Sequence, residues 1–229
     1  MTNQLELVIF DMDGLMFNTE WIGHLAWERV AEELGFSYSI DVHKSLLGKN
    51  HGGIVRTLKD RYGEEASVEQ WLEANHRMRE TIIQENGTVE KKPGLDELLA
   101  YLLNRNLKIA VASSSNRDHV IKNLEMEGIR DYFDVIVGGD QVIESKPNPE
   151  IFLLACEKAG TGAKEAIVLE DSYNGFLAAK EAGIPLFFVP DLLEATDEVN
   201  NLSAGVFESL HDVKTYIESN YPPVKTPIS

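Results

Sequence analysis

The chain has 229 residues, 43% of them hydrophobic, and a formal net charge of -17 at pH 7. This length allows one large α/β domain, or a domain that carries a smaller one. The acidic balance argues against nucleic acid as a partner, because a nucleic-acid binder normally presents a basic face. The single cysteine, Cys156, excludes an internal disulfide framework and fits a reducing compartment.

Membrane and export signals are missing from the pattern as well. No apolar run approaches the roughly 20 residues needed to cross a bilayer. The first ten residues lack the basic start and long apolar core of a signal peptide. We therefore expect a cytoplasmic protein that has no membrane partner and, by default, is a monomer.

The chain opens with an apolar run at 7–10, which predicts a buried strand, and residues 19–88 then read as helices without a strand between them. The first of these helices is indicated by apolar residues at four-residue spacing. We interpret 19–88 as an all-helical domain inserted into a core made of 1–18 and 89–229. The expected helices are 21–35, 52–63 and 68–87.

From about residue 89 onward, strand and helix signals alternate. Short apolar runs separated by helices are typical of parallel strands that are buried on both faces. The fold class predicted is therefore α/β, a doubly wound Rossmann-like parallel sheet. The expected strands are 107–115, 133–140, 166–171, 185–189 and 204–210, and the expected helices are 116–128, 148–160 and 172–183. The proline-rich end, 220–229, is expected to be poorly ordered.

Ligands of an open parallel sheet bind outside the carboxyl ends of its strands, and the first strand ends in a pair of carboxylates. Asp11 and Asp13 are two residues apart, so an extended chain sends both side chains to the same side. Two carboxylates this close repel each other unless a cation or a shared proton lies between them. The alternative is that they form only a turn and a helix cap.

Three later segments carry further polar candidates. Ser113 and Ser114 precede a helix and suit an anion, or serve as an ordinary helix cap. Lys146 lies between a strand and a helix next to two prolines, although a lone lysine is usually a solvated surface residue. Glu170 and Asp171 form a second acidic pair, which matches the oxygen ligands that Mg²⁺ prefers or, alternatively, a helix cap.

Together these residues make a phosphoryl-transfer site. Asp11 would be the nucleophile that becomes an aspartyl-phosphate, and Asp13 would be the general acid and base. Lys146 would hold phosphate oxygens with Ser113 and Ser114. The cofactor would be Mg²⁺, held by Asp11, the carbonyl of Asp13 and Asp171, with Glu170 either as a ligand or behind the ligands.

The sequence strongly resembles the haloacid dehalogenase superfamily, and within it the branch of β-phosphoglucomutase-like phosphatases. The resemblance covers nearly the whole chain and rests on "DMDG" followed by Thr19, on Ser113, on Lys146 in "SKPNPEIF" and on "EDSYNG". It implies that 19–88 is a mobile helical cap that excludes water and selects the substrate. Asp13 points to phosphate esters, because dehalogenases and phosphonate-cleaving members carry another residue there. Asn18 replaces the usual Asp, which we expect to affect the hinge or a cap contact.

The same resemblance leaves phosphatase and mutase as alternatives. Mutases of this branch use a histidine soon after the first motif and an arginine in the first cap loop. Here His24 lies about one position off, and the loop offers Lys49 and His51 but no arginine. This favours water as the acceptor and predicts a phosphatase of a small phosphorylated metabolite, a sugar phosphate above all. Lys49, His51, His24 and Arg79 are the candidate substrate residues of the cap, although His24 and His51 could also be plain surface residues.

Two non-enzymatic readings compete with this one. Phospho-acceptor signalling domains also surround Mg²⁺ with an aspartate, an acidic pair and a lysine. They place the acidic pair on the first strand and lack a cap, which reverses the order found here. An inactive scaffold is the other reading, and the intact Asp11, Asp13, Lys146 and Asp171 speak against it.

Overall fold

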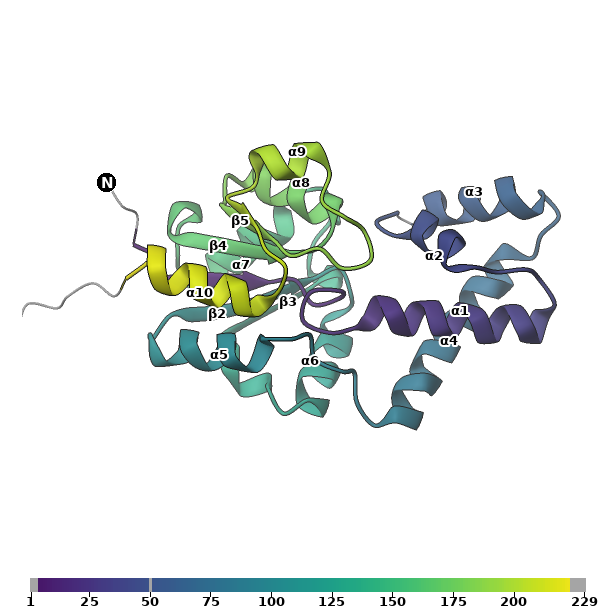
Figure 1. Cartoon of the computed structure of the whole chain (residues 1–229), viewed down its shortest axis with the longest axis horizontal. Coiled ribbons are helices and arrows are strands. Elements are labelled where there is room, and N and C mark those ends of the chain that lie inside the picture. The colour runs from purple at the N-terminus through teal and green to yellow at the C-terminus, as the bar shows by residue number, and fades with distance from the viewer. Residues whose placement is uncertain (1–3, 50, 223–229) are drawn as a thin grey trace, which may run out of the picture. The chain divides into compact units, whose positions relative to one another are not determined.

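The computed structural model describes residues 4–49 and 51–222 and divides into two compact units (Figure 1). The core unit comprises Met1–Phe17 and Glu90–Ser229, and the helical unit comprises Asn18–Val89. The expectation for the proline-rich end, 220–229, falls mainly on residues 223–229, which lie outside the described residues, whereas Asn220 still belongs to a helix. Within the described part of the chain, no helix is long and apolar enough to span a membrane.

The core unit is built on a six-stranded parallel sheet with the order β3-β2-β1-β4-β5-β6. β1 lies in the middle, where Phe10 is in register with Val111 of β2 and with Leu169 of β4. This confirms the predicted doubly wound α/β core. The strands are β1 (Leu7–Phe10), β2 (Lys108–Ser113), β3 (Val135–Gly138), β4 (Ala166–Glu170), β5 (Leu186–Phe188) and β6 (Gly205–Val206).

Helices cover the sheet because its strands are apolar on both faces. All four residues of β1 are buried, as a central strand of such a sheet requires. On one face, Leu7 and Ile9 share a core with Phe152 and Phe176, whereas α5 and α10 pack against each other and α5 against β2. The helices are α5 (Leu95–Asn104), α6 (Arg117–Met126), α7 (Glu150–Ala159), α8 (Tyr173–Ala182), α9 (Asp197–Leu202) and α10 (Leu210–Asn220), with short 3₁₀ turns at Arg130–Tyr132, Gly139–Gln141 and Ala163–Glu165.

The C-terminal part differs from the prediction. The strand expected at 204–210 is only Gly205–Val206, and α10 begins at Leu210. The Ser209 hydroxyl accepts a hydrogen bond from the Asp212 amide, which caps the helix and ends the extended segment. The helices α2 (Ile40–Leu46), α5, α9 and α10 had no counterpart in the sequence analysis. α2 and α9 have only seven and six residues, too few for a clear helical period.

The helical unit consists of α1 (Thr19–Leu34), α2 (Ile40–Leu46), α3 (His51–Tyr62) and α4 (Val68–Asn86), with α1 packed along α4. The spacing noted in the sequence puts Ile22, Ala26 and Val30 on the buried side of α1. An aromatic cluster adds to this core, since the rings of Phe36 and Trp71 stack with their centroids 3.9 Å apart. The unit therefore has its own hydrophobic core.

Candidate active site

The carboxyl ends of β1, β2 and β4 bring the predicted residues to one edge of the sheet. Because β1 pairs with both neighbours in parallel, Asp11 directly follows a strand that lies between the ends of β2 and β4. The Asp11 amide continues the ladder by donating to the Leu169 carbonyl at 3.0 Å. Asp11 is buried, so the site begins where the sheet ends and not on an exposed loop.

Lys146 brings a positive charge to this edge of the sheet. Its Nζ lies 2.5 Å from Asp11 Oδ1 and 2.8 Å from Glu170 Oε1, and it donates to the Ala112 carbonyl at 3.1 Å. Its side chain is 5% exposed, so the alternative of a solvated surface lysine is wrong. A buried ammonium that bridges two carboxylates is a fixed positive charge beside the predicted nucleophile.

Glu170 is held at both of its oxygens. Oε1 accepts from Lys146, and Oε2 accepts from the amides of Asp171 at 2.9 Å and Ser172 at 2.7 Å. Gly175 makes room for it, since a Cβ there would stand 1.8 Å from Glu170 Oε1. With both oxygens engaged by donors, Glu170 fits the place behind the metal ligands better than that of a ligand. The cap of α8 is Ser172, whose hydroxyl accepts from the Gly175 amide, and not Asp171.

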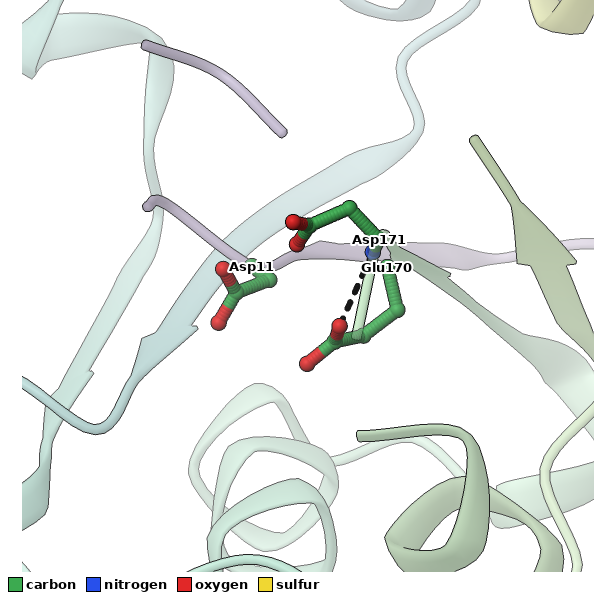
Figure 2. Close-up of side chains that lie close together, drawn as sticks. All are labelled: Asp11, Glu170 and Asp171. Atoms are coloured by element: carbon green, nitrogen blue, oxygen red, sulfur yellow. Dashed lines mark hydrogen bonds between the residues drawn. The ribbon is translucent and has the colours of Figure 1, made fainter. Parts of the chain in front are cut away.

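Asp11, Glu170 and Asp171 form an acidic cluster (Figure 2). Each offers one carboxylate oxygen, and these oxygens lie within 4.8 Å of one another. Mg²⁺ takes hard oxygen ligands and few of them from protein, usually keeping several waters. The donor set therefore fits a divalent cation of this kind.

The electrostatics of the cluster also suit a cation. The pKa of Asp11 is raised to about 8, mainly by burial; Lys146 lowers this pKa, whereas Glu170 and Asp13 contribute to the rise. Burial on its own lowers the pKa of Lys146, but the carboxylates of Asp11 and Glu170 outweigh it, so this pKa is raised and the lysine stays charged. A divalent ion at this position would favour the ionised form of Asp11.

Asp13 is held by the loop after β2. Its Oδ2 accepts from the Ser113 hydroxyl at 3.2 Å and from the Ser115 hydroxyl at 2.9 Å. Ser115 was not among the predicted site residues, although it belongs to the same run of serines. Ser114 is exposed, and its carbonyl lies against Gly139, where a Cβ would be 2.3 Å away. The serine loop thus fixes the orientation of the Asp13 carboxyl group.

The four predicted substrate residues lie in the helical unit but not in one group. Lys49 donates to the Thr57 hydroxyl at 2.6 Å, and the exposed His51 pairs with Glu69 at 3.2 Å. His24 is buried, so for this histidine the reading as a surface residue is wrong.

His24 and Arg79 belong to the polar interior of the helical unit. The Nδ1 atom of His24 lies 3.1 Å from the Tyr38 hydroxyl. Arg79 donates from Nε to Asn75 Oδ1 at 3.1 Å. Its guanidinium covers Gly23, where a Cβ would stand 2.1 Å from Arg79 Nη2. The interior also contains His43, which the sequence analysis did not single out because a lone histidine carries no motif.

Known proteins place this arrangement in a family. A family model described as haloacid dehalogenase-like hydrolase matches residues 8–189, and the chain belongs to this family. A phosphorylated carbohydrates phosphatase of Thermotoga maritima is 32% identical over 94% of this chain and 91% of its own length. The β-phosphoglucomutase of Bacillus subtilis is 29% identical over 79% of this chain and 81% of its own length.

Solved structures agree with this assignment. CbbY from Rhodobacter sphaeroides in complex with phosphate has a TM-score of 0.75 to this chain at 26% identity, covering 92% of this chain and 96% of that one. The predicted resemblance to the superfamily and to its β-phosphoglucomutase-like branch is confirmed. The prediction of an enzyme, a phosphoric monoester hydrolase of this superfamily, is likewise confirmed by the family match and the phosphatase relatives.

Proposed function

We propose that the protein is a Mg²⁺-dependent phosphatase that hydrolyses a small phosphorylated metabolite, a sugar phosphate, through an aspartyl-phosphate on Asp11. One observation carries the proposal: the buried Asp11 carboxylate lies 2.5 Å from the Lys146 ammonium and belongs to an acidic cluster at the strand ends. The sugar phosphate is supported by the phosphorylated carbohydrates phosphatase among the relatives.

Asp11 is the nucleophile in this scheme. Its carboxylate attacks the phosphorus of the ester, and the sugar oxygen leaves. Lys146 stays in place because Glu170 and the Ala112 carbonyl hold it, so its charge is available to the phosphate oxygens without reorganisation. Asp11, Asp171 and the Asp13 carbonyl would hold Mg²⁺, whose positive charge would offset repulsion between phosphate and carboxylates. Ser113 and Ser114 would bind the remaining phosphate oxygens.

Asp13 is the general acid and base. It gives a proton to the leaving oxygen and then takes one from the water that hydrolyses the aspartyl-phosphate. Ser113 and Ser115 hold its Oδ2, which limits the directions in which the carboxyl group can face. Help of this kind is worth roughly 10²- to 10⁴-fold in rate.

The helical unit is the proposed cap, with boundaries at about 19 and 88 as in the sequence analysis. Lys49, His51, His24 and Arg79 are its proposed substrate-selecting residues. The buried position of His24 and the half-buried position of Arg79 favour an indirect effect through the shape of the unit, whereas Lys49 and His51 are exposed and can meet a ligand from solvent. We further propose that the enzyme acts as a cytoplasmic monomer.

Hydrolysis of p-nitrophenyl phosphate with Mg²⁺ or with EDTA tests the reaction. We expect turnover with Mg²⁺ and loss of turnover in EDTA. Release of phosphate from a panel of phosphorylated metabolites, with sugar phosphates beside nucleotides and phosphorylated acids, then tests the substrate class. Failure to hydrolyse any phosphate ester under these conditions would support the inactive scaffold instead.

A phosphohexomutase is the second candidate, favoured by the β-phosphoglucomutase relative. Supplying β-glucose 1-phosphate together with a hexose bisphosphate separates the two reactions. A phosphatase releases inorganic phosphate and free sugar, whereas a mutase produces glucose 6-phosphate. Glucose 6-phosphate as the main product would overturn the phosphatase proposal while keeping Asp11 as the nucleophile.

A further inference from the structure

A fifth carboxylate lies at the same edge of the sheet and has no role so far. Asp191 follows the end of β5, the neighbour of β4, and its side chain is 9% exposed. Its Oδ1 forms an ion pair with Nζ of Lys92. Its Oδ2 is buried and has no hydrogen-bond partner in the part of the chain that the structure describes.

The unsatisfied oxygen faces the acidic cluster through Gly14. A Cβ built on Gly14 would stand 3.3 Å from Asp191 Oδ2 and 2.3 Å from Asp171 Oδ2. Both carboxylate oxygens therefore approach the same point, on one side of the glycine that follows the predicted acid and base. Asp191 thus lies beside Asp171, a member of the acidic cluster.

Lys92 explains how a further negative charge is tolerated there. It belongs to the segment that leads back into the core unit, and its amide donates to the Met16 carbonyl at 2.8 Å. The ammonium neutralises Asp191 but satisfies only Oδ1. A buried acceptor without a donor is destabilising, because it has lost its hydrogen bonds to water. Asp171 is a carboxylate and, when ionised, cannot donate.

We propose that Asp191 is a positioning residue of the metal site, whose Oδ2 accepts a hydrogen bond from a water molecule bound to Mg²⁺. Mg²⁺ usually keeps several of its waters, and these waters are the donors that a buried carboxylate oxygen beside Asp171 requires. Lys92 holds Asp191 in place and balances its charge. The inference rests on the proposed Mg²⁺-dependent function and adds a residue to its metal site.

Two simpler readings make different predictions. In the first, Lys92 and Asp191 only tie the returning segment to the core, so that removing them affects stability and not metal binding. In the second, Asp191 attracts the cation only through its charge, so that removing Lys92 together with Asp191 restores metal binding. The proposed hydrogen bond, by contrast, requires the acceptor oxygen of Asp191 itself, so removing Lys92 as well would not restore metal binding.

Binding of Mn²⁺ to the full chain, measured by electron paramagnetic resonance, separates these readings without relying on turnover. We expect Asp191→Leu to weaken Mn²⁺ binding about tenfold, in line with other residues that support metal-bound groups. The double variant Lys92→Met/Asp191→Leu keeps the wild-type net charge and should remain about as weak. Lys92→Met/Asp191→Asn also keeps the wild-type net charge and retains a carbonyl acceptor without an ammonium facing the NH₂ group, so it should recover most of the affinity.

The neighbouring pair Lys91 and Asp96, 2.8 Å apart, provides the matched control. Lys91→Met/Asp96→Leu removes an ion pair of the same segment and should leave Mn²⁺ binding unchanged. In hydrolysis, Asp191→Leu should raise the half-saturating Mg²⁺ concentration about tenfold. Circular dichroism of every variant shows whether it is folded, and Asp191→Ala, which also removes the acceptor but adds no bulk, keeps the test valid if Asp191→Leu does not fold.

The outcomes are separable from those of the proposed function. Wild-type Mn²⁺ affinity in Asp191→Leu, or a return of that affinity in Lys92→Met/Asp191→Leu, would overturn the inference. If the wild-type chain binds Mn²⁺ but hydrolyses no phosphate ester, the proposed function is wrong and the Mn²⁺ measurements still decide on Asp191. If the wild-type chain binds no Mn²⁺ at all, both proposals are wrong.

Discussion

Gly14 lies so close to Asp171 that a Cβ atom on the glycine would stand 2.3 Å from Asp171 Oδ2. The glycine also has a φ of +84°, which L side chains rarely adopt. The close approach of Asp171 and the left-handed backbone therefore both require a glycine at position 14. A glycine here lets the chain turn after Asp13 and leaves room for the carboxylate of the second acidic pair.

Replacing Gly14 by alanine should therefore damage the metal site in particular. We expect the Cβ to displace Asp171, because a real Cβ essentially never approaches a carboxylate oxygen this closely. A displacement of about 1 Å at a catalytic site can cost on the order of 10²-fold in rate. The measurements are kcat/KM and the half-saturating Mg²⁺ concentration.

Gly63→Ala is the matched control for this substitution. Gly63 also has a left-handed conformation, with a φ of +100°, but nothing lies within 4 Å of the added Cβ. Both variants should lose about 1–3 kcal/mol of unfolding free energy through backbone strain. Only Gly14→Ala should require more Mg²⁺, and equal Mg²⁺ requirements in the two variants would contradict the displacement of Asp171.

Asp11→Asn should abolish turnover while the chain remains folded. The amide is a far poorer nucleophile than the carboxylate, and removal of a nucleophile costs on the order of 10⁴-fold or more in kcat. Phosphate release and far-ultraviolet circular dichroism are the two measurements. Asp118→Asn, on the exposed side of α6, should behave as wild type. Substantial activity in Asp11→Asn would show that another group attacks the phosphorus.

Glu170→Gln tests the support of Lys146. The Gln oxygen can accept the two amide hydrogen bonds, but the NH₂ group then faces the Lys146 ammonium, so that two donors meet. We expect a loss of about 1.5–3 kcal/mol in unfolding free energy, the value of a hydrogen bond to a charged group, and a lower kcat. Urea unfolding and steady-state kinetics measure both.

The control for Glu170→Gln is Glu157→Gln, because Glu157 is exposed on α7. This variant should keep the wild-type unfolding free energy and kcat. If Glu170→Gln were as stable and as active as the control, Asp11 and the Ala112 carbonyl alone would suffice to hold Lys146.

The sequence was enough to group the site because parallel strands end at a common edge. The residues at the ends of the strands predicted at 7–10, 107–115 and 166–171 had to lie close together once the sheet was inferred, and Asp11, Ser113 and Glu170 do. The sequence placed Lys146 only approximately at this edge, since the position of its ammonium group depends on the path of the segment after β3. The different roles of Glu170 and Asp171 could not be told apart from the sequence. Two adjacent residues at a strand end face in different directions, and the sequence does not show which of them faces Lys146.

Long-range partners left no local signal. Lys92 and Asp191 are 99 positions apart in the chain, and neither belongs to a motif. His43 is similar, since its burial depends on how α1, α2 and α4 pack. Short helices such as α2 were missed for a related reason: their stability comes from packing against the rest of the unit and not from their own pattern.

His43 makes the stability of the protein depend on pH. Its side chain is 2% exposed, and Nε2 donates to the Glu20 carbonyl at 3.0 Å. The pKa of His43 is lowered to about 4, mainly by burial; Arg79 and the nearby His24 also lower this pKa, whereas the hydrogen bond to Glu20 raises it. The folded protein therefore holds His43 neutral, while the unfolded chain binds a proton near the ordinary value of 6.5.

The direction in which pH changes the stability follows from this difference in pKa between the folded and the unfolded chain. Between pH 6.5 and pH 4 the unfolded chain binds more protons at His43, so the free energy of unfolding falls as the pH is lowered through this window. At pH 5 the loss of unfolding free energy from this one group is about 2 kcal/mol.

In His43→Gln, which keeps a donor but does not titrate, the fall in unfolding free energy between pH 7.5 and pH 5 should be smaller by that amount. His76→Gln, at an exposed histidine of α4, should show the wild-type fall. Urea unfolding at the two pH values measures the difference, and an undiminished fall in His43→Gln would mean that another group causes the acid sensitivity.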